Sequence, residues 1–356
     1  MAFQFKIDGR SIGEGQPPYV IAEISGNHMG SLNTAFALIE AAKNAGADAV
    51  KFQTYEAHTI TLDSDDPAFV VQEDLWKGKK LYDLYKKAQT PFSWHPELFK
   101  KAKTVGITAF SAPFDHTAVD LLENLNSPAY KIASCELVDI PLLKRVAKTG
   151  KPIILSSGMA TEAEINEALA TLRENGASEI ALLHCISGYP TPFADANIKT
   201  IEKLRDKYDV PIGISDHTLG MAVPIAATAL GATIIEKHLC LDRSSEAVDA
   251  AFSLEPDELA ALVKHCRDAH AALGSPLLAP VASEADSLRF RRSLYFTEDI
   301  AAGAEIPTNA VRSLRPAGGL HTRHLDEIVG RRANTAIKAG TPVAWELLRQ
   351  ETDKKG

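Results

Sequence analysis

Two histidines end neighbouring apolar stretches of the sequence, which read GISDHT and IIEKH. His217 and His238 would lie side by side if these stretches are adjacent β-strands, because neighbouring strands are about 4.8 Å apart. Two imidazoles at the same height can bind one divalent metal ion and leave coordination positions open, as catalytic sites do. A single strand-end histidine is more often a hydrogen-bonded core residue, but the matching pair favours a metal site.

Two lysines lie in apolar stretches where an unpaired ammonium would be costly. Lys51 follows ADAV and Lys131 follows PAY, while Glu23 and Glu236 lie in two further apolar stretches. We expect each lysine either to form an ion pair with one of these carboxylates or to bind a phosphate or carboxylate of a ligand.

A possible anion site ends another apolar stretch, at Ser156, Ser157 and Gly158. Thr161 and Glu164 follow in the pattern of a capping box, which predicts that a helix begins there. Hydroxyls and backbone amides before a helix can hold an anion. Ser-Ser-Gly is also an ordinary turn, so the signal is weak alone.

The elements that must position these residues alternate along the chain. Segments of helical period, often closed by glycine, separate short apolar runs rich in β-branched residues. Such units over roughly 250 residues favour a (β/α)8 TIM barrel, although a doubly wound sheet has a similar pattern. The eight runs are residues 19–25, 47–55, 107–114, 129–134, 152–158, 179–187, 211–218 and 233–240.

A barrel would bring the chemical residues to one end. Side chains two apart on a strand point the same way, and the carboxyl ends of barrel strands face the active site. Ser215 should therefore share a face with His217, and Glu236 with His238. The sequence predicts one centre that holds two lysines, two histidines and a glutamate.

Composition changes mark three domain segments. We expect a catalytic barrel with an N-terminal extension over residues 1–274, a linker containing Pro and Ser over 275–289, and a small β-rich domain over 290–350. The segment 56–95 is too long for a plain connection and should be a lid over the barrel mouth. Its aromatic residues fit lid packing as well as substrate stacking.

The overall composition excludes several classes of function. The chain has 356 residues, 45% of them hydrophobic, and a net charge of −8, which gives no nucleic-acid footprint. No apolar run approaches the roughly 18–20 residues of a membrane span. The four widely spaced cysteines favour structural thiols over a disulfide framework or zinc site. We expect a cytoplasmic globular protein.

Seven ordered motifs resemble the sialic acid synthase family, and with the C-terminal segment the likeness runs from about residue 5 to 348. The family condenses phosphoenolpyruvate with an acylated amino sugar to a nine-carbon 2-keto sugar acid. The resemblance implies a TIM barrel followed by an antifreeze-like (SAF) domain. The motifs are IAEISGNHMGSL, AAKNAGADAVKFQT, PAYKIAS, GKPIILSSGMAT, ALLHCISGYPTP, GISDHTLGMAVP and IIEKHLCLDRS.

Residues 75–95 and 248–256 look like the pseudaminic branch of that family. The N-acetylneuraminate branch tends to carry Pro-Gly-Pro-Asp where this chain reads SEAVD. The implied sugar is 2,4-diacetamido-2,4,6-trideoxy-L-altrose, and N-acetylneuraminate or legionaminate synthesis is the alternative within the family. A Schiff-base aldolase using Lys51 or Lys131, or a sugar-binding barrel, remains open from the residues alone.

The resemblance also implies individual roles. His217 and His238 would hold a manganese or magnesium ion, and Glu23 would handle a proton or orient a water beside it. Arg315 would come from the partner subunit of a domain-swapped homodimer. Phosphoenolpyruvate would be bound by Lys51, Lys131, Ser134, Ser156, Ser187 and Ser215, and the sugar by Asn27, Gln53, Tyr189, Asp249 and Arg315.

One position departs from the family pattern. Ala112 stands in FSAPF where the family often has threonine, so one hydroxyl to the ligand is missing. We expect Ser111 or a water to substitute for it, or the phosphoenolpyruvate pocket to differ slightly.

Overall fold

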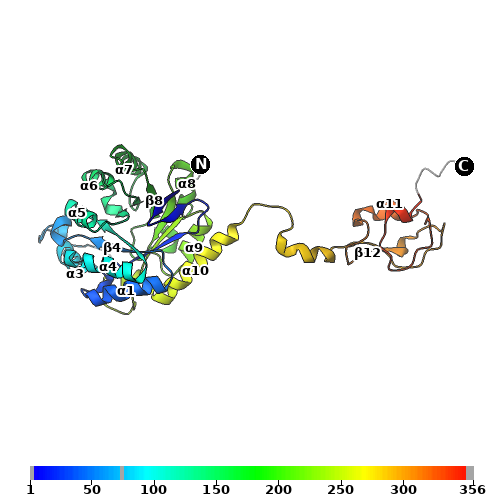
Figure 1. Ribbon diagram of the computed structural model, residues 1–356, viewed down its shortest axis with the longest axis horizontal. Helices are drawn as coiled ribbons and strands as arrows, with labels where there is room; N and C mark the ends of the chain where they lie inside the picture. Colours follow the sequence, from blue (N-terminus) through cyan, green and yellow to red (C-terminus); the bar gives the residue numbers. More distant parts are fainter. Residues whose placement is uncertain (1–3, 73–75, 350–356) are drawn as a thin grey trace. The chain divides into compact units, whose positions relative to one another are not determined.

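A computed structural model describes residues 4–72 and 76–349 of the chain. Parts of the predicted barrel, lid and C-terminal domain, at residues 1–3, 73–75 and 350, lie outside this description. The chain divides into two compact units, residues 1–274 and 275–356. Figure 1 shows both units.

Unit one contains a closed barrel of eight parallel strands, which confirms the predicted fold (Figure 1). The strands follow one another around the barrel in chain order, and the last pairs with the first through Ile234 and Tyr19. All eight runs predicted from the sequence contain one strand each. The strands are β3 (Tyr19–Glu23), β4 (Ala49–Thr54), β5 (Thr108–Pro113), β6 (Tyr130–Ile132), β7 (Ile153–Ser156), β8 (Ile180–Cys185), β9 (Ile212–Asp216) and β10 (Ile234–His238).

Helices surround the barrel and cover its outer face (Figure 1). Outward-facing strand residues such as Val50, Ile214 and Ile235 pack with helix residues in one large apolar cluster. Thr161 and Glu164 form the predicted capping box at the start of α7. The helices are α1 (Leu32–Asn44), α4 (His95–Val105), α5 (His116–Asn124), α6 (Ile140–Ala147), α7 (Glu162–Glu174), α8 (Thr200–Lys207), α9 (Ala222–Ala229) and α10 (Pro256–Leu273). Within the described ranges, no helix is long and apolar enough to cross a membrane.

A hairpin closes the end of the barrel where the strands begin. β1 (Gln4–Ile7) and β2 (Arg10–Gly13) are antiparallel and join through Asp8 and Gly9, whose φ angles are 48° and 81°. Positive φ at both turn residues is typical of a type I′ turn, which Asp-Gly favours. The hairpin's apolar side chains pack inside the barrel against the first residues of the strands.

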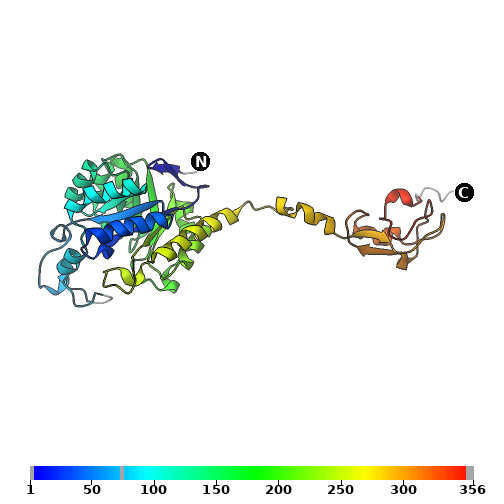
Figure 2. The same ribbon diagram turned by 60° about the horizontal axis from the view of Figure 1, so that its bottom comes forward.

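The predicted lid lies at the opposite end of the barrel domain from this hairpin (Figure 2). It contains two short helices, α2 (Ala57–Ile60) and α3 (Leu81–Ala88). Gln89 accepts a hydrogen bond from the amide of Ala57 at 3.0 Å, which ties the two ends of the segment together.

Unit two has its own small core. Strands β11 (Ser293–Phe296) and β12 (Val311–Leu314) pair antiparallel, and one short helix, α11 (Leu325–Ile328), packs on the same core. The segment predicted as a linker contains a 3-10 helix, η7 (Ala282–Phe290).

Candidate functional site

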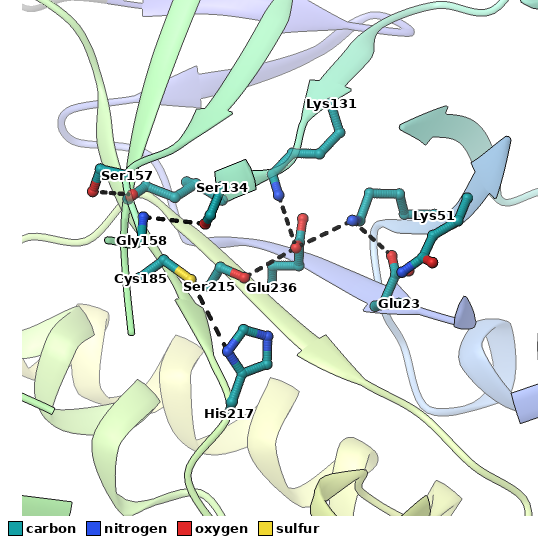
Figure 3. A network of polar contacts seen from close by, with 12 residues as sticks. Glu23, Lys51, Lys131, Ser134, Ser157, Gly158, Cys185, Ser215, His217 and Glu236 are labelled. Atoms are coloured by element: carbon teal, nitrogen blue, oxygen red, sulfur yellow. Dashed lines mark hydrogen bonds and ion pairs between the residues drawn. The ribbon is translucent and has the colours of Figure 1, made fainter. Parts of the chain in front are cut away.

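Four charged residues meet inside the barrel near the carboxyl ends of the strands (Figure 3). Lys51 Nζ lies 2.8 Å from Glu23 Oε2 and 3.3 Å from Glu236 Oε1. Lys131 Nζ lies 3.1 Å from the same Glu236 oxygen. All four side chains are buried. Strand register produces this meeting, because Glu23 is the partner of Lys51 in the β3–β4 pair.

The cluster places two ammonium groups against two carboxylates, and the pKa values of the two acids shift in opposite directions. Burial alone would raise the pKa of Glu236, but Lys131 and Lys51 hold it well below its usual value. Burial raises the pKa of Glu23 above its usual value even though Lys51 opposes the shift. Glu23 is therefore the carboxyl of this pair that takes up a proton more readily.

A group of serine hydroxyls surrounds Gly158, just after the end of β7. The amide of Gly158 donates to Ser134 Oγ at 3.1 Å. A Cβ at this glycine would overlap Ser187 Oγ and lie 2.6 Å from Ser134 Oγ. Among the described residues, the buried Oγ atoms of Ser156 and Ser187 have no hydrogen-bond partner. These hydroxyls can therefore bind an anion. Ser215 instead donates to Glu236 Oε1 at 3.1 Å.

The histidine pair lies beside the charged cluster. The rings of His217 and His238 are 5.3 Å apart. His217 Nδ1 donates to the carbonyl of Ile186 at 2.9 Å, and His238 Nδ1 lies 3.2 Å from Ser25 Oγ. In the part of the chain that the structure describes, every polar contact of the two rings is made through Nδ1.

This use of Nδ1 fits a metal site, since a ligating histidine usually bonds its second nitrogen to the protein and binds metal through the other. Nε2 of both rings is available for that role. Within residues 4–72 and 76–349, no group of three or more His, Cys, Asp or Glu side chains is placed to hold a metal. Two histidines as the protein ligands would leave the remaining positions to water and substrate.

Aromatic rings enclose the histidines. Tyr189 lies 4.5 Å from the ring of His217, and Phe252 lies 5.0 Å from the ring of His238. Trp76 of the lid lies 5.9 Å from Tyr189, so the lid contacts the site through this pair. The sequence had indicated Tyr189, whereas Phe252, in the loop after β10, was missed.

The residues predicted to bind the sugar differ in their surroundings. Gln53 Nε2 donates to Glu23 Oε1 at 3.0 Å and thus belongs to the charged cluster. Asn27 donates to the carbonyl of Leu239 and to Ser253 Oγ, and it accepts from the amide of Asp249 at 3.2 Å. Its side chain thereby holds the loop that carries Asp249.

Of the other two residues predicted to bind the sugar, Asp249 lies at the edge of the histidine pair and Arg315 lies in the other unit. Asp249 Oδ2 lies 3.7 Å from His238 Nδ1. Arg315 follows β12 in unit two, so its contact with a barrel stays a prediction.

The suggestion that Ser111 replaces the missing threonine hydroxyl is wrong. Ser111 pairs in register with Phe52, which packs in the outer apolar layer, and its Oγ lies 2.6 Å from Thr54 Oγ1. Ala112, in register with Gln53, is the residue on the inner face. Alternation along β5 therefore points Ser111 away from the inside of the barrel.

Glu136 is a titratable residue that the sequence reasoning missed. It lies in the 3-10 helix η4 (Ser134–Val138), and burial raises its pKa to about 7, although Lys131 and Lys51 oppose the shift. Its Oε2 atom is buried and has no hydrogen-bond partner among the described residues. Glu136 lies in a turn after a strand, where no hydrophobic period predicts that its carboxyl group would be buried.

A closed parallel barrel with a polar centre at the strand carboxyl ends is the arrangement of (β/α)8 enzymes. The NeuB family model matches residues 38–277, and the SAF domain model matches residues 291–349. The chain belongs to the NeuB family.

Relatives match nearly the whole chain. It is 43% identical to the pseudaminic acid synthase of Helicobacter pylori, over 94% of this chain and 99% of the relative. It is 35% identical to the N,N'-diacetyllegionaminic acid synthase of Legionella pneumophila, over 96% and 98%. The crystal structure of an N-acetylneuraminic acid synthetase from Leptospira borgpetersenii, in complex with citrate, matches with a TM-score of 0.73 and 34% identity, covering 81% of this chain and 96% of that one.

Proposed function

We propose that this protein is a pseudaminic acid synthase. It would condense phosphoenolpyruvate with 2,4-diacetamido-2,4,6-trideoxy-L-altrose and release phosphate by C–O cleavage. The observation that carries the proposal is the pair of buried lysines, Lys51 and Lys131, in one barrel end with a group of serine hydroxyls and a histidine pair. This arrangement offers separate places for an anionic substrate and for an aldehyde.

Phosphoenolpyruvate carries a carboxylate and a phosphate, which match two ammonium groups and the hydroxyls of Ser134, Ser156 and Ser187. Charge-assisted hydrogen bonds of this kind are roughly twice as strong as neutral ones. On binding, the ligand would take over ammonium hydrogens that now point at Glu23 and Glu236. Glu23 and Glu236 then lose part of their counter-charge, so binding adds negative charge to the buried cluster.

Manganese or magnesium would be held by His217 and His238 through Nε2. When bound, the ion supplies Lewis-acid polarisation of the sugar's aldehyde oxygen. Tyr189 packs on the ring of His217 and Phe252 packs on the ring of His238, so both aromatic residues help to hold the imidazoles in place.

The reaction requires proton movement that Glu23 is placed to support. C3 of phosphoenolpyruvate forms a bond to the aldehyde carbon, whose oxygen takes up a proton. Water then adds at C2 and loses a proton, and the resulting intermediate breaks its C–O bond and releases phosphate. Glu23, with its raised pKa and a hydrogen bond from Gln53, is the residue that accepts and returns the proton.

The choice of sugar rests on similarity. The chain is 43% identical to the pseudaminic relative and 35% identical to the legionaminic one over comparable lengths. A legionaminate-type sugar is therefore the second candidate substrate.

We also propose that the enzyme acts as a domain-swapped homodimer in which Arg315 reaches the sugar bound by the partner. A cytoplasmic location agrees with its four cysteines, all of which are free.

The test measures phosphate release from phosphoenolpyruvate with manganese present, in parallel reactions with the diacetamido sugar, a legionaminate-type sugar and N-acetylmannosamine, with product masses recorded. We expect release with the diacetamido sugar and its loss in His217→Ala and His238→Ala. His184→Gln is the matched control, because His184 is a buried strand histidine that bonds the carbonyl of Ala196 on the outer face. Release with another sugar would overturn the substrate assignment, and release with none would overturn the activity.

A further inference from the structure

A second pair of buried charges lies on the outer faces of the two strands that end in the histidines. Asp216 directly precedes His217, and Lys237 directly precedes His238. The two residues are register partners in the parallel pairing of β9 with β10. Since side chains alternate along a strand, this pair lies behind the barrel wall while the histidines lie inside it.

The contacts of the pair are short and numerous. Lys237 Nζ lies 2.6 Å from Asp216 Oδ2 and also donates to the carbonyl of Thr218. Asp216 accepts from the amide of Thr218 at 3.1 Å and from its hydroxyl at 3.0 Å. The network thus fixes Asp216 and Thr218, the residues on each side of His217, against the residue before His238.

A gain in folding stability is a weak explanation for the buried ion pair of Asp216 and Lys237. Lys237 is 0% and Asp216 4% exposed, and their strand neighbours Ile214 and Ile235 belong to the apolar layer beneath the helices. Replacing a buried ion pair by apolar side chains of similar volume is often neutral or stabilising, because both charges must be desolvated. What an ion pair adds that two apolar residues do not is a directed, short contact between two strands.

We propose that Asp216 and Lys237 are positioning residues that set the separation and orientation of the two imidazoles. The inference rests on the proposed metal site of His217 and His238. Lys237 Nζ donates to the carbonyl of Thr218 and pairs with Asp216. The same ammonium therefore fixes the chain on both sides of His217. A shift of β9 against β10 would change the distance between the Nε2 atoms, and metal affinity depends on that distance.

The test uses the full chain and the double variant Asp216→Asn with Lys237→Met, which removes both charges together. Thermal unfolding without metal reports stability, and electron paramagnetic resonance of free Mn²⁺ reports the dissociation constant without any turnover. We expect little change in unfolding and a loss of Mn²⁺ affinity of about tenfold, within the range for outer-shell partners. Asp48→Asn is the control, because Asp48 accepts from the amide of Val20 at 2.9 Å where the strands begin.

Thr218→Val is a milder second variant, which removes one hydrogen bond to Asp216 and keeps the ion pair. It should weaken Mn²⁺ binding by less than the double variant does. A folded double variant with wild-type Mn²⁺ affinity overturns the inference. If the double variant does not fold, wild-type Mn²⁺ affinity in Thr218→Val overturns it. Absence of Mn²⁺ binding in the wild type instead overturns the metal site itself, so the two failures are distinguishable.

Discussion

Replacing Glu236 by glutamine removes one of the two carboxylates that balance Lys51 and Lys131. Glu236 Oε1 lies 3.3 Å and 3.1 Å from the two ammonium nitrogens. Within the described residues, Glu236 is the only carboxylate that forms an ion pair with Lys131. Glutamine keeps the shape and an acceptor oxygen, so the substitution changes mainly the charge.

The expected loss is large because the remaining ammonium is buried. Breaking a buried ion pair by removing one partner costs about 3–5 kcal/mol. At about 2 °C per kcal/mol for a large domain, the melting temperature should fall by about 6–10 °C. Burial already lowers the pKa of Lys131. The stability difference between Glu236→Gln and wild type should therefore shrink as the pH rises from 7 to 9, because a neutral lysine needs no partner.

Phosphoenolpyruvate should reverse much of this loss. If it binds the two lysines, its anionic oxygens replace the missing carboxylate, and the difference in unfolding free energy between variant and wild type should narrow by about 2 kcal/mol. Differential scanning fluorimetry with and without phosphoenolpyruvate, and without sugar, measures both quantities.

The matched control is Glu123→Gln, which weakens a half-exposed ion pair with Lys151 at 3.0 Å. It should cost at most about 1 kcal/mol and leave the ligand-induced shift unchanged. A Glu236→Gln protein as stable as wild type, or one stabilised no more than wild type by phosphoenolpyruvate, would refute the assignment of the lysines.

Three further substitutions test other parts of the site. Gly158→Ala should raise KM for phosphoenolpyruvate by about 10- to 100-fold by displacing the hydroxyls of Ser134 and Ser187, whereas Gly188→Ala should not, since its Cβ would meet nothing closer than 3.7 Å. Glu136 has a pKa raised from 4.5 to about 7, so its stabilising contribution is complete below pH 4.5 and declines as the pH rises through 7. In urea unfolding, the free energy of unfolding of Glu136→Gln should therefore exceed that of wild type by about 3 kcal/mol at pH 8 and by at most about 1 kcal/mol at pH 5. A variant as stable as wild type at both pH values would contradict the raised pKa. Asn27→Leu frees the loop of Asp249 and should raise KM for the sugar more than KM for phosphoenolpyruvate in steady-state assays.

Two-residue alternation let the sequence predict most of the inner face. Once eight apolar runs are taken as barrel strands, the parity of each strand puts Lys51, Glu236 and Ser215 inside, and the structure places them within contact of one another. The same rule, applied along β5, would have shown that Ser111 points outward with Phe52. A hydroxyl that is near in sequence is thus not near the ligand unless it lies on the same face of the strand.

Other features left weaker signals. Lys237 lies in an apolar strand just as Lys51 does, so its need for a partner could have been inferred, but its opposite parity kept it out of the predicted centre. Glu136 and Phe252 lie in 3-10 turns beyond the strand ends, where no period predicts burial. Loops of this kind depend on tertiary contacts that one sequence does not display.

The ion pairs of the inner cluster also suggest how substrate binding prepares the proton-transferring group. Lys51 is the ammonium that forms an ion pair with Glu23, at 2.8 Å, and it opposes the rise in the pKa of that carboxyl that burial causes. When Lys51 turns to the anionic groups of phosphoenolpyruvate, Glu23 loses part of this counter-charge and gains a nearby anion. Both changes raise its pKa further. Glu23 therefore takes up a proton when phosphoenolpyruvate binds and can donate it to the aldehyde oxygen, so proton uptake should accompany phosphoenolpyruvate binding in wild type and be absent in Glu23→Gln.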